Sequence, residues 1–368
     1  MSGWANKAVR RLAAEMREFR RWKALRAADD VRVYYGMDRL PSRAEPISGG
    51  IVKCLDLAER FPHSPDKANL LYLVSSALPE RRELLARAAR RAGGRFVLNQ
   101  NGVAYPAWAG ADWRERNTPN ARVHAAADFV VYQSAFCRRC AERFLGARKG
   151  PGEVLYNPVD TEAFSPRKDF DQPVRSPMLL AAGSHHDGYR VKTAIEALAL
   201  VRRSGTEARL VVAGRLVWGP EAEAEARRWA RGAGVEKVVE FHGAYPQTEA
   251  PALFRKADVL VHLKVQDPCP RLVVEAMACG VPVVYSATGG VPELVGGEAG
   301  VGIPGPEDFE EIHPPSAEAV AEGLLRALAD RGPLARQARA RALRMFSARD
   351  WVDAHRRIFE ALARENGT

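Results

Sequence analysis

Residues 258–296 read DVLVHLKVQDPCPRLVVEAMACGVPVVYSATGGVPELVG. The runs DVLVHL (258–263) and VPVVY (281–285) are apolar and rich in β-branched residues, which is typical of buried strands. A helical stretch at 272–278 separates them. A strand, a helix and a second strand in this order predict a parallel sheet with helices packed on it.

The same alternation extends along most of the chain. Before this stretch, MLLAAG (178–183), RLVVAG (209–214) and VVEFHG (238–243) are predicted strands with helical stretches between them. An earlier series of predicted strands lies at 31–35, 70–75, 96–100, 128–132 and 153–157. Two such series predict an α/β protein with two Rossmann-like, doubly wound parallel-sheet domains in tandem.

A break in the alternation predicts the domain boundary. Residues 160–177 contain prolines, aspartates and arginines without a strand pattern. We therefore expect a first domain at 1–170 and a second at 171–346, in agreement with the length of 368 residues, because a single core rarely grows that large. The pattern is helical from Ser316, and the last helix is expected at 347–368.

Composition limits the function classes. Hydrophobic residues make up 46% of the chain and charged residues 27%, as in an average globular protein. No apolar run approaches the roughly 20 residues that cross a bilayer, and no secretory signal is evident, so we expect a cytoplasmic protein. The five cysteines are expected to be reduced thiols, and the CxxC pair Cys137 and Cys140 lacks neighbouring residues to complete a metal site.

The net charge of +10 predicts an attraction to phosphate-bearing partners. Much of the excess lies in residues 1–28, where apolar residues at helical spacing predict a basic amphipathic helix. Two interpretations stay open: the helix packs its apolar stripe on the first domain, or it binds the anionic inner face of the cell membrane peripherally.

The junction after the strand at 258–263 offers the richest candidate site. Ligands of parallel sheets bind beyond the carboxyl ends of the strands, and Asp267 lies at that position. Two prolines, the second of them Pro270, end the strand and set the turn. Glu275 lies on the helix that follows, so both carboxylates can reach one ligand.

The helix itself opens with backbone groups that can bind an anion. Its first N–H groups belong to Arg271, Leu272 and Val273, where a diphosphate or a sugar can bind. The chain contains neither GxGxxG nor GxxxxGK[ST], which excludes the standard dinucleotide-binding and P-loop classes.

These residues resemble a known family. Two acids separated by seven positions, Asp267 and Glu275, followed by AMACGVPVV and GGVPELV, are similar to the hallmark of the family-four retaining glycosyltransferases of the GT-B fold, the group 1 glycosyltransferases. The first acid of that family is usually Glu, one methylene longer than Asp267. The resemblance implies two domains that face each other across a cleft, with the helix at 347–368 packing back on the first domain.

The resemblance also implies roles for single residues. Asp267 would contact the transferred sugar and Glu275 the ribose of the donor. Gly49 and Gly50, which precede a helix, resemble the glycine loop that approaches the donor phosphates and sugar. Asn101 lies where many family members place a histidine, and its amide can hydrogen-bond a sugar but cannot act as a base. His124, on a predicted helix, is interpreted as structural rather than catalytic.

A pair of basic residues is expected to clamp the donor diphosphate. In the family an arginine and a lysine follow the first strand of the second domain, but Ser184 replaces that arginine here. Arg190 and Lys192 are the candidates, since a guanidinium and an ammonium both suit phosphate oxygens. The alternative is that both face solvent on the first turn of a helix.

The function that the resemblance implies is transfer of a hexose-type sugar from a nucleotide-diphosphate sugar to a glycan or lipid-linked acceptor, with retention at the anomeric carbon and without a metal or other cofactor. Two alternatives are kept. A sugar-nucleotide epimerase of the same fold would act on the donor alone, and a non-catalytic basic protein would bind nucleic acid or lipid, although we expect no nucleic-acid partner.

Overall fold

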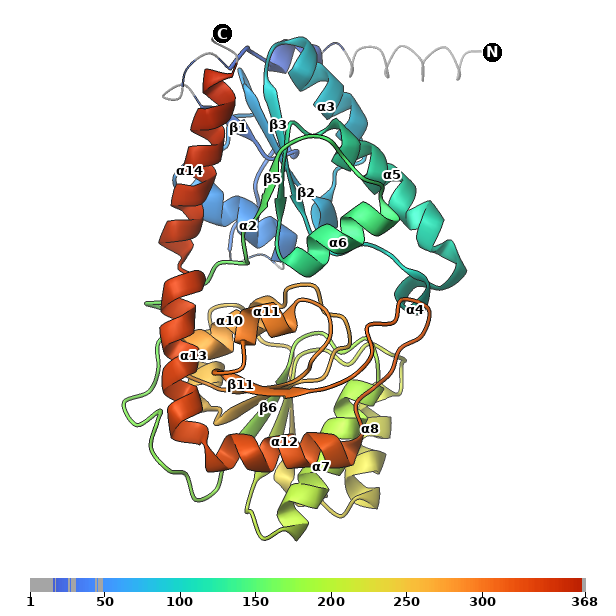
Figure 1. Cartoon of the computed structure of the whole chain (residues 1–368), viewed down its shortest axis with the longest axis vertical. Helices are drawn as coiled ribbons and strands as arrows, with labels where there is room; N and C mark the ends of the chain where they lie inside the picture. The colour runs from blue at the N-terminus through green and yellow to red at the C-terminus, as the bar shows by residue number, and fades with distance from the viewer. Residues whose placement is uncertain are drawn as a thin grey trace. The chain divides into compact units, whose positions relative to one another are not determined.

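The structure is a computed structural model, and it describes residues 16, 18–25, 27, 31–43, 45 and 49–365. Most of the predicted amphipathic helix at 1–28 lies outside these residues. The chain divides into two compact units, the first formed by Met1–Leu155 and Arg349–Thr368 and the second by Tyr156–Ala348. Each unit is built on one parallel sheet, as Figure 1 shows.

The first unit contains a five-stranded parallel sheet in the order β1-β2-β3-β4-β5. Its strands are β1 (Val33–Tyr34), β2 (Leu70–Val74), β3 (Arg95–Gln100), β4 (Phe129–Tyr132) and β5 (Gly152–Val154). All five residues of β2 are buried, because helices cover both faces of the sheet. The last predicted strand, 153–157, ends already at Val154.

Helices pack on both faces of the first sheet (Figure 1). Those of one face are α2 (Gly49–Ala58) and α14 (Ala348–Arg364), and those of the other are α3 (Arg82–Arg91), α5 (Trp113–Ala126) and α6 (Ala135–Phe144), with the short α4 (Pro106–Ala109) before α5. Ser134 caps α6 by accepting a hydrogen bond from the N–H of Cys137. The rings of Phe61 and Phe359 lie 5.0 Å apart, so the end of the chain forms part of this core.

The second unit contains a six-stranded parallel sheet in the order β11-β10-β9-β6-β7-β8. Its strands are β6 (Met178–Ala182), β7 (Arg209–Ala213), β8 (Val239–Gly243), β9 (Val259–His262), β10 (Val283–Ser286) and β11 (Gly300–Ile303). The first five were predicted. The sixth, β11, was not.

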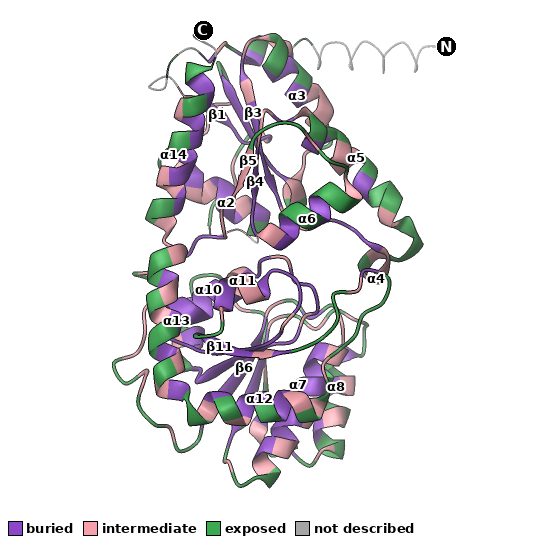
Figure 2. Ribbon diagram, in the orientation of Figure 1, coloured by how far each residue is buried: buried purple, intermediate pink, exposed green. Residues whose placement is uncertain are grey.

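Two apolar cores sandwich this sheet. One core packs α9 (Ala250–Lys256), α10 (Arg271–Ala278), α11 (Val291–Val295) and α13 (Arg331–Met345) on one face, and the other packs α7 (Tyr189–Arg203), α8 (Ala222–Gly232) and α12 (Ala317–Ala329) on the opposite face. Successive residues of β6 enter different cores: Leu179 joins one and Leu180 the other. In Figure 2 the inner strands are buried, whereas exposed residues lie on the outer sides of the helices and in the loops.

The division between the units differs from the expected boundary at 170/171. Residues 156–170 belong to the second unit because they bond to it: Asn157 Nδ2 donates to the carbonyl of Cys269 at 2.6 Å, and the N–H of Val159 donates to the carbonyl of Phe346 at 2.8 Å. The ring of Phe164 packs on that of Phe254, with 6.2 Å between centroids. A segment without regular structure thus forms part of a core, which its composition did not indicate.

The five cysteines are free thiols, and all of them are buried. Cys137 and Cys140 lie on α6, among the buried residues of that helix. Among the residues that the structure describes, no helix combines the length and the apolar character of a membrane span.

Candidate functional site

The candidate site lies where the strand order of the second sheet reverses. From β6 the chain adds β7 and β8 on one side and then crosses back to place β9, β10 and β11 on the other. In parallel sheets, ligands commonly bind beyond the carboxyl ends of the strands at such a reversal, which here lies between β6 and β9. The loop after β6 leads to Arg190 on α7, and the loop after β9 contains Asp267.

Asp267 is the centre of this site. Its side-chain oxygen Oδ2 lies 3.2 Å from His262 Nε2 and 3.3 Å from Lys264 Nζ. Asp267 is 8% exposed and His262 is fully buried at the end of β9. Neither ring nitrogen of His262 makes a well-aligned hydrogen bond to a described residue. Among the described residues no hydrogen bond or ion pair engages the second oxygen, Oδ1.

The charge state of this group follows from its surroundings. Burial by itself would raise the pKa of Asp267, but the charge of Lys264, the close approach of His262 Nε2 and the charge of Arg190 outweigh it and hold this pKa well below its usual range. Burial lowers the pKa of His262, although Asp267 opposes this shift. At neutral pH the site therefore contains a carboxylate, a neutral imidazole and two cations.

The backbone around Asp267 is held by the loops after β10 and β11. Gln266 has the left-handed φ of 53°, which costs energy for a residue with a side chain. Its N–H donates to Thr288 Oγ1 at 2.9 Å and its Nε2 donates to the carbonyl of Asp308 at 2.6 Å. A Cβ on Gly289 would lie 2.6 Å from the backbone of Gln266, so only glycine allows this approach.

Glu275 forms the second acidic position of the site. It is 5% exposed on α10, and its Oε1 accepts a hydrogen bond from Gln247 Nε2 at 3.0 Å and lies 3.3 Å from Arg271 Nε. In the described part of the chain, Oε2 has no hydrogen bond or ion pair. One oxygen of each acid is thus held in place while the other is available to a ligand.

The first turn of α10 differs in one detail from the expectation. Pro270 is the residue before the helix, and its carbonyl accepts the N–H of Val273 at 3.1 Å. The N–H of Val273 is therefore occupied within the protein. The N–H of Leu272 has no acceptor among the described residues, and Arg271 directs its guanidinium to Glu275. Fewer N–H groups than the predicted three are available here to an anion.

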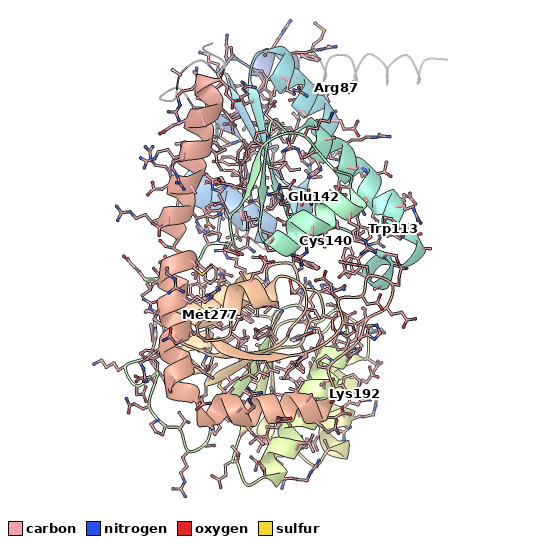
Figure 3. All side chains as sticks on the ribbon, viewed as in Figure 1. Arg87, Trp113, Cys140, Glu142, Lys192 and Met277 are labelled. Carbon is pink, nitrogen blue, oxygen red and sulfur yellow. The ribbon has the colours of Figure 1, made fainter. Side chains whose placement is uncertain are left out.

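The two predicted clamp residues are separated by the structure. Arg190 is 6% exposed, donates from Nη1 to the carbonyl of Ser184 at 3.0 Å and acts on the pKa of Asp267. Lys192 is half exposed on the surface of α7, with its Nζ 3.9 Å from Glu196 (Figure 3). Residues two positions apart in a helix point in nearly opposite directions, so Arg190 and Lys192 cannot face one ligand together. The lysine beside Asp267 is Lys264, which was not predicted.

The remaining predicted residues lie in the first unit. Gly49 and Gly50 begin α2, and a Cβ on Gly50 would lie 2.6 Å from Ser76 Oγ, so the helix approaches the loop after β2 closely. Asn101, which follows β3, donates from Nδ2 to the same Oγ at 2.6 Å. His124 is buried, with Nε2 2.9 Å from the hydroxyl of Tyr132, as expected for a structural histidine.

A buried lysine that the sequence analysis missed organises this edge of the first sheet. Lys53 Nζ donates to Asn99 Oδ1 at 3.0 Å, Asn101 Oδ1 at 2.9 Å and Gln133 Oε1 at 2.8 Å. Three acceptors match the three protons of an ammonium group. Lys53 lies three positions after Gly50 and four before Leu57, on the buried face of α2. This helical spacing could have predicted that the lysine is buried.

Comparison with known proteins gives one matching family and several relatives. Residues 165–345 match the family model described as glycosyl transferases group 1. The chain is 30% identical over 234 residues to the GDP-mannose-dependent alpha-(1-6)-phosphatidylinositol monomannoside mannosyltransferase of Mycolicibacterium smegmatis, covering 58% of this chain and 57% of that protein. It is 28% identical over 244 residues to the glycogen synthase of Mycobacterium tuberculosis, covering 62% and 54%.

A further relative matches over a shorter stretch. The D-inositol 3-phosphate glycosyltransferase of Streptomyces bingchenggensis is 36% identical over 99 residues, which are 26% of this chain and 21% of that protein. The chain therefore spans between about a fifth and somewhat more than half of the lengths of these curated relatives.

Solved structures share the fold over most of the chain. A structure of Anabaena Alr3699/HepE in complex with UDP and glucose has a TM-score of 0.64 at 17% identity, covering 85% of this chain and 83% of that one. The sucrose-phosphate synthase of Thermosynechococcus elongatus has a TM-score of 0.63 at 20% identity, covering 86% and 77%. At these identities the likeness concerns the fold.

Proposed function

We propose, from the match of residues 165–345 to the group 1 glycosyltransferases, that the chain is such an enzyme and transfers a sugar from a nucleotide-diphosphate sugar to a hydroxyl group of an acceptor. The donor would bind at the carboxyl edge of the second sheet, where the loops after β6 and β9 meet. Relatives whose printed names include GDP-mannose or UDP support a nucleotide-sugar donor.

The observation that carries this proposal is the pair of buried acids at α10. Each of Asp267 and Glu275 has one oxygen held by the protein and a second oxygen that no described residue engages. Carboxylates of this kind bind pairs of sugar hydroxyls. In this proposal Asp267 binds the transferred sugar and Glu275 binds the ribose, as the resemblance implies.

The reaction breaks the bond between the anomeric carbon and the terminal phosphate oxygen of the donor. The electron pair stays on the nucleoside diphosphate, the acceptor oxygen bonds to the anomeric carbon, and the proton of the acceptor hydroxyl passes to the departing phosphate oxygen. In this proposal, Arg190 and the N–H of Leu272 stabilise the departing negative charge. Losing one such donor would raise the barrier by about 3 kcal/mol, by analogy with oxyanion holes.

Several finer properties are part of the proposal. We propose a hexose-type sugar, retention at the anomeric carbon, no metal requirement and a glycan or lipid-linked acceptor; the names of the mannosyltransferase and glycogen synthase relatives support sugar acceptors of both kinds. Peripheral contact of residues 1–28 with an anionic membrane is a separate proposal, tested by flotation with liposomes that contain anionic lipid.

The experiment that tests the function is a thermal-shift screen of nucleotide sugars, followed by product analysis with the donor that stabilises the protein. A ligand at about 100 times its dissociation constant adds roughly 2.7 kcal/mol of stability. A new glycoside, with the anomeric configuration read by NMR, supports the proposal. An isomerised donor formed without acceptor would identify an epimerase, and binding to nucleic acid without nucleotide-sugar binding would identify a non-catalytic protein.

A further inference from the structure

Lys264 lies in the donor site but in none of the positions that the family resemblance implies for a phosphate-binding lysine. It follows β9 by two residues, and its Nζ lies 3.3 Å from Asp267 Oδ2. That contact is an ion pair, and no hydrogen bond joins the ammonium group to a described residue. The side chain is 34% exposed, so a ligand that enters the site can reach it.

The loop after β6 lacks the arginine that the resemblance leads us to expect for binding the donor diphosphate. Ser184 stands where the family has an arginine, and Lys192 pairs with Glu196 on the surface of α7. Within the described residues of the second unit, the cations that act on Asp267 are Lys264 and Arg190. Nε of Arg190 is buried and has no described partner, although Nη1 is held by a carbonyl.

We propose that Lys264 binds the donor diphosphate and replaces the clamp lysine that Lys192 does not supply. This inference rests on the proposed function and assigns a residue to it. In the complex, the Lys264 ammonium keeps its contact with Asp267 and donates a hydrogen bond to an oxygen of the terminal phosphate. Arg190 then holds the diphosphate from the side of α7.

The arrangement solves an electrostatic problem of the site. Asp267 would bind the transferred sugar, so its carboxylate lies close to the phosphate attached to that sugar, and two anions at such a distance repel each other. An ammonium group that contacts both anions offsets this repulsion. Binding of the sugar and binding of the leaving diphosphate would also depend on each other, because the same ammonium group contacts Asp267 and the phosphate.

The test compares ligands that do and do not carry phosphate. Binding of UDP, GDP and ADP, and of uridine, guanosine and adenosine, is measured by titration calorimetry for the wild type and for Lys264→Met. We expect the variant to bind its preferred nucleoside diphosphate roughly 10- to 100-fold more weakly, the usual effect of losing a charge-assisted hydrogen bond. Affinity for the corresponding nucleoside should change less than about twofold, since the nucleoside lacks the phosphate. Lys264→Arg should restore most of the diphosphate affinity, because it keeps the charge.

Two further variants make the result specific. Lys237→Met removes an exposed lysine outside the donor site and is expected to leave both affinities unchanged. Lys192→Met tests the rival clamp residue and is also expected to have no effect. Equal losses for nucleoside and nucleoside diphosphate in Lys264→Met, or a loss in Lys192→Met instead, would overturn the inference. A wild type that binds none of the nucleoside diphosphates would contradict the proposed function itself.

Discussion

Tyr72 Oη lies 3.0 Å from His355 Nε2, although 283 positions separate the two residues. His355 Nδ1 lies 2.9 Å from the carbonyl of Trp351, which can only accept, so Nδ1 carries the proton and Nε2 accepts from the tyrosine. Asn99 Nδ2 donates to Tyr72 Oη at 3.1 Å, and Asn99 Oδ1 accepts from Lys53. In this chain of hydrogen bonds each group donates to the next, from Lys53 on α2 through Asn99 and Tyr72 to His355 on α14.

Removing the hydroxyl in the middle of this chain should destabilise the first unit. Tyr72→Phe leaves a buried acceptor on His355 and a buried donor on Asn99 without partners, which should lower the free energy of unfolding by about 1–3 kcal/mol. Urea unfolding followed by circular dichroism measures this. The matched control is Tyr34→Phe, because the hydroxyl of Tyr34 is 3.4 Å from Asp38 at a partly buried position. Equal effects of the two variants would contradict the account.

The buried lysine should contribute more than an exposed one. Lys53→Met leaves three amide oxygens without their donor, so we expect the free energy of unfolding to fall by about 3 kcal/mol. Lys149→Met, at an exposed position of the same unit, should change it by less than about 0.5 kcal/mol. Both are read from urea unfolding curves. A Lys53→Met protein as stable as the wild type would show that the three contacts are replaceable.

Stability should fall as the pH decreases from about 6.5 towards 4. Burial lowers the pKa of His355 and of His124 to about 4, and that of His185 to about 3, from an ordinary value near 6.5. The unfolded chain therefore takes up protons first, and each histidine removes up to about 1.4 kcal/mol per pH unit in this window. Melting temperatures at pH 7.5, 6.5 and 5.5 measure the effect.

A variant separates this effect from general acid sensitivity. His355→Gln should be less stable than the wild type at pH 7.5 but should lose less additional stability between pH 6.5 and 5.5. His186→Gln, at an exposed position without an ion pair to a described residue, should follow the wild-type pH dependence. A wild-type melting temperature that stays constant or rises on acidification would contradict the assignment of neutral buried histidines.

The two acids of the donor site should be required for turnover. Asp267→Asn and Glu275→Gln keep the side-chain size but lose the charge that grips the donor, and each should lower donor turnover about 100- to 1,000-fold, a loss of about 3–4 kcal/mol of transition-state stabilisation. Glu223→Gln is the control, since Glu223 pairs with Arg227 on the surface of α8. Product formation is followed by chromatography. Wild-type rates in either site variant would remove that residue from the site.

Activity should not depend on a divalent metal. In the proposed reaction, Arg190 and Lys264 supply the positive charge that the leaving diphosphate needs. Assays after dialysis against EDTA are expected to give the rate of the untreated enzyme within about twofold, measured with the donor found in the screen. Loss of activity that Mg²⁺ or Mn²⁺ restores would contradict this prediction.

Much of the fold could be predicted because continuous apolar strands alternate with amphipathic helices. The two parallel sheets and the likeness to solved glycosyltransferases confirm the expected GT-B class. β11 was missed because its sequence, GVGI, is four residues long and half glycine, so it has little strand propensity of its own. The boundary at 155/156 depends on tertiary contacts of Asn157 and Val159, which no local pattern reports.

The positions of the two acids could be predicted where sequence spacing determines them. Asp267 follows a strand and Glu275 lies on the next helix, and both remain candidate site residues. Arg190 and Lys192 were predicted as a pair, but α7 begins at Tyr189, so the two side chains lie on different sides of the helix. The contact of Lys264 with Asp267 was not predicted, although only three positions separate the two residues. The partners Gln247 and His262 reach the site through folding, and no motif indicates them.

The most direct test of the account is a crystal structure of the protein with the nucleoside diphosphate that binds best. We expect ribose hydroxyls on Glu275, phosphate oxygens at the first turn of α10 with Lys264 and Arg190 in contact, and Asp267 Oδ1 directed to the space next to the terminal phosphate. Nucleotide density elsewhere in the molecule, with Asp267 and Glu275 contacting only protein, would contradict it.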